Sequence, residues 1–74
     1  MRKATKAEVQ ALARRHGYEL GAARRGIATD WIVELWGEYE GRRVLVRESR
    51  EFQLAAAYGG LATWLRARPD RRAA

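Results

Sequence analysis

Residues 29–49 read TDWIVELWGEYEGRRVLVRES, and this stretch decides the fold of the chain. Two runs of alternating apolar and polar residues flank a short turn between Gly37 and Gly41, a pattern typical of a β-hairpin. Because successive side chains of a strand point to opposite faces, the alternation predicts one wholly apolar face. The members of this face are Trp31, Val33, Leu35, Val44 and Val46. Another part of the chain must therefore cover it.

The opposite face of the predicted hairpin mixes apolar and charged side chains. Small soluble monomers rarely leave an apolar cluster uncovered, and Trp and Arg are enriched at the hot spots of interfaces. We therefore predict a protein interface on this face, which serves either a protein partner or a homodimer. Its members are Ile32, Trp36, Leu45, Arg43 and Arg47. Alternatively, the helices divide between the two faces, or the C-terminal tail folds over this one.

A first helix is predicted over about residues 5–16. Thr5 and Glu8 occupy the two positions of a capping box, and Gly17 can take the left-handed conformation that ends a helix. One stripe of the helix is formed by Val9, Leu12, Ala13 and His16. A structural role is predicted for His16, because a cation in the last helical turn suits the helix dipole.

A second helix is predicted over about residues 50–67. Ser49 can cap its start, and Pro69 ends it. Its apolar stripe is formed by Leu54, Tyr58, Leu61 and Leu65. Gly59 and Gly60 lie in the middle of this helix, which indicates close packing against the sheet, a kink or a hinge.

The remaining segments complete a three-stranded sheet. Residues 18–23 alternate weakly and predict a first strand, and residues 24–26 predict the turn that follows it. The hairpin supplies the other two strands, near residues 28–36 and 42–48. Short connections favour an antiparallel meander. The predicted fold is therefore α+β in the order α-β-β-β-α, a three-stranded antiparallel meander packed against two helices.

The chain of 74 residues has room for one core. We assign residues 1–68 to a single small domain and residues 69–74 to a disordered basic tail. The side chains predicted to be exposed are Arg14, Arg15, Arg24 and Tyr39. The side chains predicted to be buried are Trp31, Val33, Val44, Val46, Leu54, Tyr58 and Leu61.

Positive charge is concentrated at the two ends of the chain. The formal net charge is +6, with +4 in residues 1–16, −1 in residues 17–63 and +3 in residues 64–74. A polyanion should meet these ends first, so we predict nonspecific, salt-dependent contact with nucleic-acid phosphates. The candidate residues are Lys3, Lys6, Arg14, Arg15, Arg24, Arg25, Arg66 and Arg68. The alternative is that these side chains form only a solvated helix surface and a frayed tail.

Groups that could perform catalysis are sparse. His16 is the only histidine, Ser49 is the only serine, and there is no cysteine. Glu38 and Glu40 share the hairpin turn, where nothing nearby would desolvate them. No Gly-rich phosphate loop is present. We therefore predict a non-enzymatic protein that needs no cofactor or metal.

The sequence also predicts a cytoplasmic protein that does not enter a membrane. The absence of cysteine fits a reducing compartment. The longest apolar stretch is far shorter than the ~20 residues that span a bilayer. The first residues lack the apolar middle section of a signal peptide.

The order α-β-β-β-α and the basic balance resemble a double-stranded-RNA-binding domain over nearly the whole chain. In that family the start of the second helix meets phosphates across the major groove. The matching stretch here, residues 49–57, reads SREFQLAAA and keeps the alanines with a single arginine. The family's loop between its first two strands falls on residues 24–27, which lack Pro and His. The resemblance implies RNA-duplex binding, with a minor-groove face made of Gln10, Arg14 and Arg15.

Overall fold

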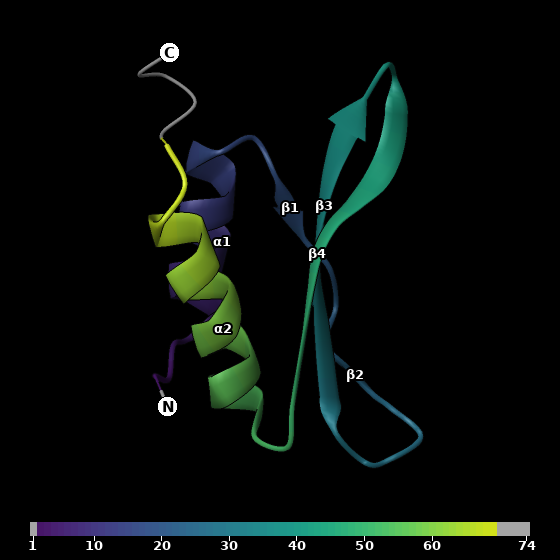
Figure 1. Cartoon of the computed structure of the whole chain (residues 1–74), viewed down its shortest axis with the longest axis vertical. Helices are drawn as coiled ribbons and strands as arrows, with labels where there is room; N and C mark the ends of the chain where they lie inside the picture. Colours follow the sequence, from purple (N-terminus) through teal and green to yellow (C-terminus); the bar gives the residue numbers. More distant parts are fainter. Residues whose placement is uncertain (1, 70–74) are drawn as a thin grey trace.

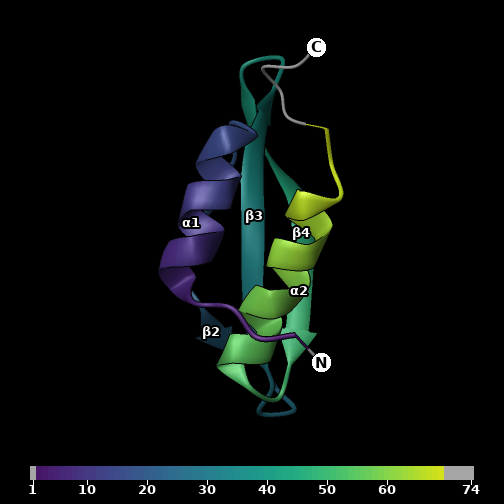
Figure 2. The same cartoon turned by 90° about the vertical axis from the view of Figure 1, so that its left-hand side faces the viewer.

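The sheet is built around one central strand. The computed structural model describes residues 2–69, and its elements are α1 (Lys6–Arg15), β1 (Glu19–Leu20), β2 (Arg24–Arg25), β3 (Trp31–Tyr39), β4 (Arg42–Glu51) and α2 (Leu54–Arg66). β1 and β2 pair antiparallel with one edge of β3, and β4 pairs antiparallel with the other. Figures 1 and 2 show α1 and α2 side by side on one face of the sheet, here called the inner face. The predicted α+β fold is confirmed, with four strands rather than three.

β1 covers only part of the strand predicted at residues 18–23, and after an interval at residues 21–23 β2 lies where a turn was predicted. The chain stays close to β3 in this interval, because the Gly21 amide donates to the Glu34 carbonyl at 2.9 Å. A Cβ on Gly21 would lie 3.1 Å from the indole nitrogen of Trp36. The glycine therefore lets the backbone pass this ring closely.

The turn after β2 lies at residues 26–30, later than predicted, because the two preceding arginines pair with β3. The Gly26 amide donates to the Asp30 carbonyl at 2.8 Å, and Thr29 has a φ of 63°. The Arg25 guanidinium donates to the Thr29 carbonyl at 2.7 Å. These bonds close the loop against the start of β3.

The start and end of α1 follow the predicted signals. The Thr5 hydroxyl accepts a hydrogen bond from the Glu8 amide at 3.1 Å, and the Glu8 carboxylate accepts one from the Thr5 amide at 3.3 Å. Gly17 has a φ of 76°, in the left-handed region. His16 is the buried C-cap residue, and its ring stacks on Tyr18 with centroids 6.1 Å apart.

Replacing Thr5 by alanine should lower the free energy of unfolding by about 1 kcal/mol, because the Glu8 amide loses the hydroxyl oxygen that accepts its hydrogen bond. Thr5→Ser keeps the hydroxyl and should remain close to the native value. Urea unfolding followed by far-ultraviolet circular dichroism measures both. An equal loss in the two variants would show that the hydroxyl contributes nothing.

α2 begins at Leu54, so the prediction that Ser49 caps it is wrong. Ser49 pairs with Val33 inside β4, which continues to Glu51. The N-cap residue is Gln53, whose side chain makes no capping hydrogen bond. Pairing with β3 along the whole strand therefore outweighs the local preference of serine for a cap.

α2 ends at Arg66, before Pro69, as predicted. It is continuous through Gly59 and Gly60. Within residues 2–69, neither helix is long and apolar enough to cross a membrane. Of the basic tail predicted at residues 69–74, residues 70–74 lie outside the part that the structure describes.

A β-bulge shifts the register between β3 and β4. Leu35 pairs with Arg47 and Trp36 pairs with Leu45, so Val46 is the extra residue. Arg47 therefore lies on the inner face, opposite a core leucine. The prediction that Arg47 shares a face with Leu45 is wrong, because the alternation is broken between them.

The main core lies between the helices and the inner face. Its fully buried large side chains are Val9, Val33, Leu35, Leu61 and Leu65. Of the predicted core, Val33, Tyr58 and Leu61 are buried, whereas Trp31, Val44, Val46 and Leu54 are half-buried. The four side chains predicted to be exposed are all exposed, namely Arg14, Arg15, Arg24 and Tyr39.

Candidate nucleic-acid interface

The two basic ends of the sequence meet in one layer of the structure. α1 and α2 lie side by side (Figure 2), and the Arg66 guanidinium pairs with the Glu8 carboxylate between them at 3.4 Å. We define the helix layer as residues 2–16 and 54–69. It carries seven basic side chains and one carboxylate, a net charge of +6. Two charge runs that are far apart in the sequence thus become one surface.

The sheet and its turns hold almost all the carboxylates of the described chain. Residues 17–53 carry six arginines and seven carboxylates, a net charge of −1. On the outer face Arg24 pairs with Glu34 at 3.4 Å, and Arg50 pairs with Glu48 at 2.7 Å. The outer face therefore largely neutralises itself, and a polyanion is attracted to the helix layer instead.

Lys6 and Arg14 lie along one line of α1, with Gln10 between them at helical i, i+4, i+8 spacing. Both are exposed, and neither forms an ion pair with any residue in 2–69. A rise of 1.5 Å per residue separates them by about 12 Å along the helix. The two charges are thus available to different phosphates of one polyanion.

Two further cationic side chains lie against the ring of Trp64 on α2. The guanidinium carbons of Arg68 and Arg47 lie 4.5 Å and 5.6 Å from the centre of its ring. The Tyr18 ring also lies near Trp64, with the two ring centroids 6.3 Å apart. Among residues 2–69 neither arginine forms an ion pair, so both charges remain open to an anion.

Sequence reasoning missed part of this cluster. Arg68 was a candidate, and the i, i+4 spacing of Trp64 and Arg68 would have placed the two on one side of the helix. Arg47 was assigned to the opposite face of the sheet, and only the bulge at Val46 brings it to α2. No periodic signal in the sequence marks that bulge.

The remaining candidates divide between the two faces. Arg24 lies on the outer face, where Glu34 neutralises it, so it does not join the helix layer. Arg25 lies over the Trp31 ring at 4.4 Å on the inner face. Lys3 belongs to the N-terminal segment of the helix layer and lines a hollow beside Phe52 at the start of α2.

The predicted apolar cluster on the outer face is not open to solvent as a whole. Ile32 is only 1% exposed, and a Cβ on Gly26 would lie 2.9 Å from its Cδ1 atom. The loop at residues 26–30 therefore covers it. Leu45 is 47% exposed and pairs with Trp36, away from this loop.

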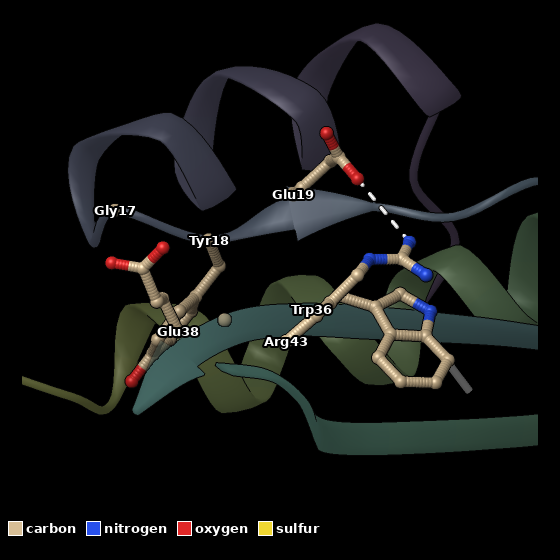
Figure 3. A pocket seen from close by; sticks show the side chains of 7 residues that line it. Gly17, Tyr18, Glu19, Trp36, Glu38 and Arg43 are labelled. Atoms are coloured by element: carbon tan, nitrogen blue, oxygen red, sulfur yellow. Dashed lines mark hydrogen bonds and ion pairs between the residues drawn. The ribbon is translucent and has the colours of Figure 1, made fainter. Parts of the chain in front are cut away.

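Trp36 and Arg43 form the middle of the outer face, beside a hollow of about 310 Å³ (Figure 3). The Arg43 guanidinium lies 4.2 Å from the centre of the Trp36 ring and pairs with Glu19 at 3.2 Å. The side chain of Arg43 thus covers the indole and is itself neutralised. Of the five residues predicted as an interface, only Trp36, Arg43 and Leu45 remain together on an accessible surface.

Two side chains have shifted pKa values, and in both the cause is burial or an ion pair of the fold. Burial raises the pKa of Tyr58, and the hydrogen bond that Arg50 donates to Glu48 raises the pKa of Arg50. Both shifts favour the form already present at neutral pH, so neither creates a reactive group. Within residues 2–69, no three His, Asp or Glu side chains are grouped so that they could hold a metal ion.

Comparisons with protein-family models, with curated proteins and with solved structures found no match to this chain. The helix layer, defined by its own charges and contacts, is the candidate site.

Proposed function

We propose that this chain is a small, non-enzymatic, cytoplasmic protein that binds nucleic acid by contacting phosphates through the helix layer. The observation that carries the proposal is the meeting of both basic ends on α1 and α2, with seven basic side chains against one carboxylate, a net charge of +6. Seven carboxylates lie in the sheet and its turns, which gives the molecule one attractive side. Such a separation favours a polyanion that approaches from the helices.

The contacts in the helix layer, and those of Arg47 in β4 beside it, support phosphate binding over recognition of bases. Lys6 and Arg14 project from α1 without carboxylate partners in residues 2–69. Arg47 and Arg68 are held beside Trp64, which fixes two guanidinium groups that can each form paired hydrogen bonds with a phosphate. Backbone phosphates carry no sequence information, so binding should be nonspecific.

The double variant Lys6→Gln, Arg14→Gln should weaken binding to a short RNA duplex by about tenfold or more at moderate salt. The plot of log affinity against log salt should become shallower by about 0.9 for each lost phosphate contact. Fluorescence anisotropy over a salt series measures both quantities. A DNA duplex and a single strand, measured beside the RNA duplex, identify the preferred form.

The matched control is Arg42→Gln, Arg43→Gln, which removes the same charge from the hairpin and the outer face. This control should change affinity by less than about threefold, through long-range attraction alone. Equal losses in the two double variants would place the contact elsewhere. Absence of binding at low salt would reject nucleic acid as the ligand.

A further inference from the structure

β4 is a long strand with one unused edge. It runs for ten residues, Arg42–Glu51, and within residues 2–69 it pairs only with β3. β2 and β4 lie at opposite margins of the sheet (Figure 2). The outer edge of β4 therefore presents a row of backbone donors and acceptors that can pair with another strand.

We propose that a second copy of this chain pairs antiparallel with β4, centred on Ser49, and forms a two-fold symmetric homodimer with a continuous sheet. The centre of β4 reads RESRE, residues 47–51. Read against itself in the antiparallel direction, this segment places Arg47 opposite the second copy's Glu51. It also places Glu48 opposite the second copy's Arg50, and Ser49 opposite the second copy's Ser49. Every charged residue of the segment thus faces its opposite charge.

Symmetry selects this register over its neighbours. A two-fold axis that relates antiparallel neighbours in one sheet is perpendicular to the sheet, so paired residues share a face. At the axis, one residue pairs with the same residue of the second copy. Centring on Arg47 or Arg50 would oppose two guanidinium groups, and centring on Glu48 would oppose two carboxylates. Like charges directly opposite each other are destabilising, whereas opposite charges are stabilising. Ser49 is the only uncharged centre within residues 47–51.

The same register covers two exposed apolar side chains. Leu45 is 47% exposed and Phe52 is 75% exposed. Because Val46 is the extra residue of the bulge, Leu45 lies only three strand steps from Ser49, as its pairing with Trp36 shows. Phe52 follows Ser49 by three residues. Phe52 lies one residue beyond the end of β4, so the register brings each Leu45 to the level of the other copy's Phe52 at the end of the paired segment.

Of the four charged groups that the register uses, Arg47 and Glu51 are available, whereas Arg50 already pairs with Glu48 at 2.7 Å within one chain. Neither Arg47 nor Glu51 forms an ion pair within residues 2–69. Above the centre of β4, Gly60 is exposed, and a Cβ there would lie 2.7 Å from the Ser49 hydroxyl oxygen. Thr63 and Ala67 continue this side of α2, so small side chains leave room for the second copy's helix.

Charge reversal tests the register. Glu51→Arg places two arginines opposite each other at both ends of the segment and should raise the dimer dissociation constant by about tenfold or more. Arg47→Glu places two carboxylates opposite each other and should weaken the dimer similarly. It should do so even though it lowers the net charge of each chain from +6 to +4, which reduces the overall repulsion between the copies. The double variant Arg47→Glu, Glu51→Arg restores complementarity and should restore the dimer. Sedimentation and light scattering without nucleic acid measure all four proteins, so failure of the proposed binding function leaves this test intact.

Hydrogen exchange supplies a second readout. The β4 amides that point away from β3 should be protected in the native chain at high concentration and should lose protection in Glu51→Arg. Glu38→Arg makes the same charge change on β3, outside the segment, and should leave the dimer intact; circular dichroism confirms that each variant is folded. A native chain that stays monomeric with unprotected outer amides overturns the proposal. So does a dimer that ignores Glu51→Arg, or one that the double variant fails to restore.

Discussion

The substitution Ile32→Ala should lower the free energy of unfolding by about 2–4 kcal/mol, although the alternation of β3 places this residue on the face that the helices do not cover. Ile32 is only 1% exposed, because the loop at residues 26–30 lies against it. Removing three carbons leaves a cavity that the loop, closed by the bond from Gly26 to Asp30, cannot fill freely. The melting temperature of a domain this small should fall by roughly 10 °C or more.

Leu45→Ala is the matched control on the same face. Leu45 is 47% exposed, so its truncation in the monomer should change stability by less than about 1 kcal/mol. Both variants are compared by urea and thermal unfolding at low protein concentration. Small and equal losses would show that the loop does not cover Ile32 in solution, which would restore the predicted apolar cluster.

The burial of Ile32 shows where pattern reasoning ends. Alternation determines which side chains share a face, and it correctly placed Val33 and Leu35 on the inner face. It contains no information about a loop that folds beneath the opposite face. That loop depends on Thr29 at positive φ and on Arg25 reaching its carbonyl, which are tertiary features of one particular turn.

Local signals predicted the elements that depend on local bonds. Thr5 and Glu8 cap α1 as their spacing indicates. The hairpin turn lies at residues 40–41, beside Gly41 as predicted, but Gly37 does not bound it, because β3 continues to Tyr39 and Gly37 pairs with Val44. Ser49 carries an equally plausible capping signal and is part of a strand instead. Its hydroxyl offers one bond to a helix start, whereas β4 gains a ladder of bonds and cross-strand contacts by continuing to Glu51.

The candidate site was predictable in composition and not in geometry. Counting charges identified the ends of the chain, including Lys6 and Arg14. That both ends lie in one layer follows from the packing of α1 on α2, which no residue count reveals. Arg47 of β4 lies beside Trp64 of this layer only because Val46 is bulged, and a bulge changes the face of a side chain without changing its sequence pattern.

Gly59→Ala and Gly60→Ala should change stability in opposite directions, although the two glycines are neighbours in one helix. A Cβ on Gly59 would collide with the Arg2 carbonyl oxygen and would lie 2.7 Å from the Arg2 carbonyl carbon. The N-terminal segment crosses α2 here, and the Ala4 amide donates to the Ala55 carbonyl at 3.0 Å. Backbone must therefore move, and the free energy of unfolding should fall by about 1–3 kcal/mol.

Gly60→Ala meets only a side chain, the Ser49 hydroxyl oxygen at 2.7 Å, which can rotate away. Alanine is better than glycine inside a helix by about 1 kcal/mol, so this variant should be neutral or more stable than the native chain. Urea unfolding of both variants gives the two signs directly. If both variants are destabilised, α2 packs against Ser49 of the sheet too tightly to admit a methyl group at residue 60.

Removing residues 1–3 isolates the cause of the Gly59 effect. Without Arg2 the added methyl group has no backbone to displace, so Gly59→Ala should stabilise the shortened chain by about 1 kcal/mol through helix propensity alone. The change of sign between the full and shortened chains is a coupling between Gly59 and the N-terminal segment, which a double-mutant cycle measures. An equal loss in both chains would assign the effect to the helix itself. The reversal would instead show that glycine is required at residue 59 so that the basic N-terminal segment can pack across α2.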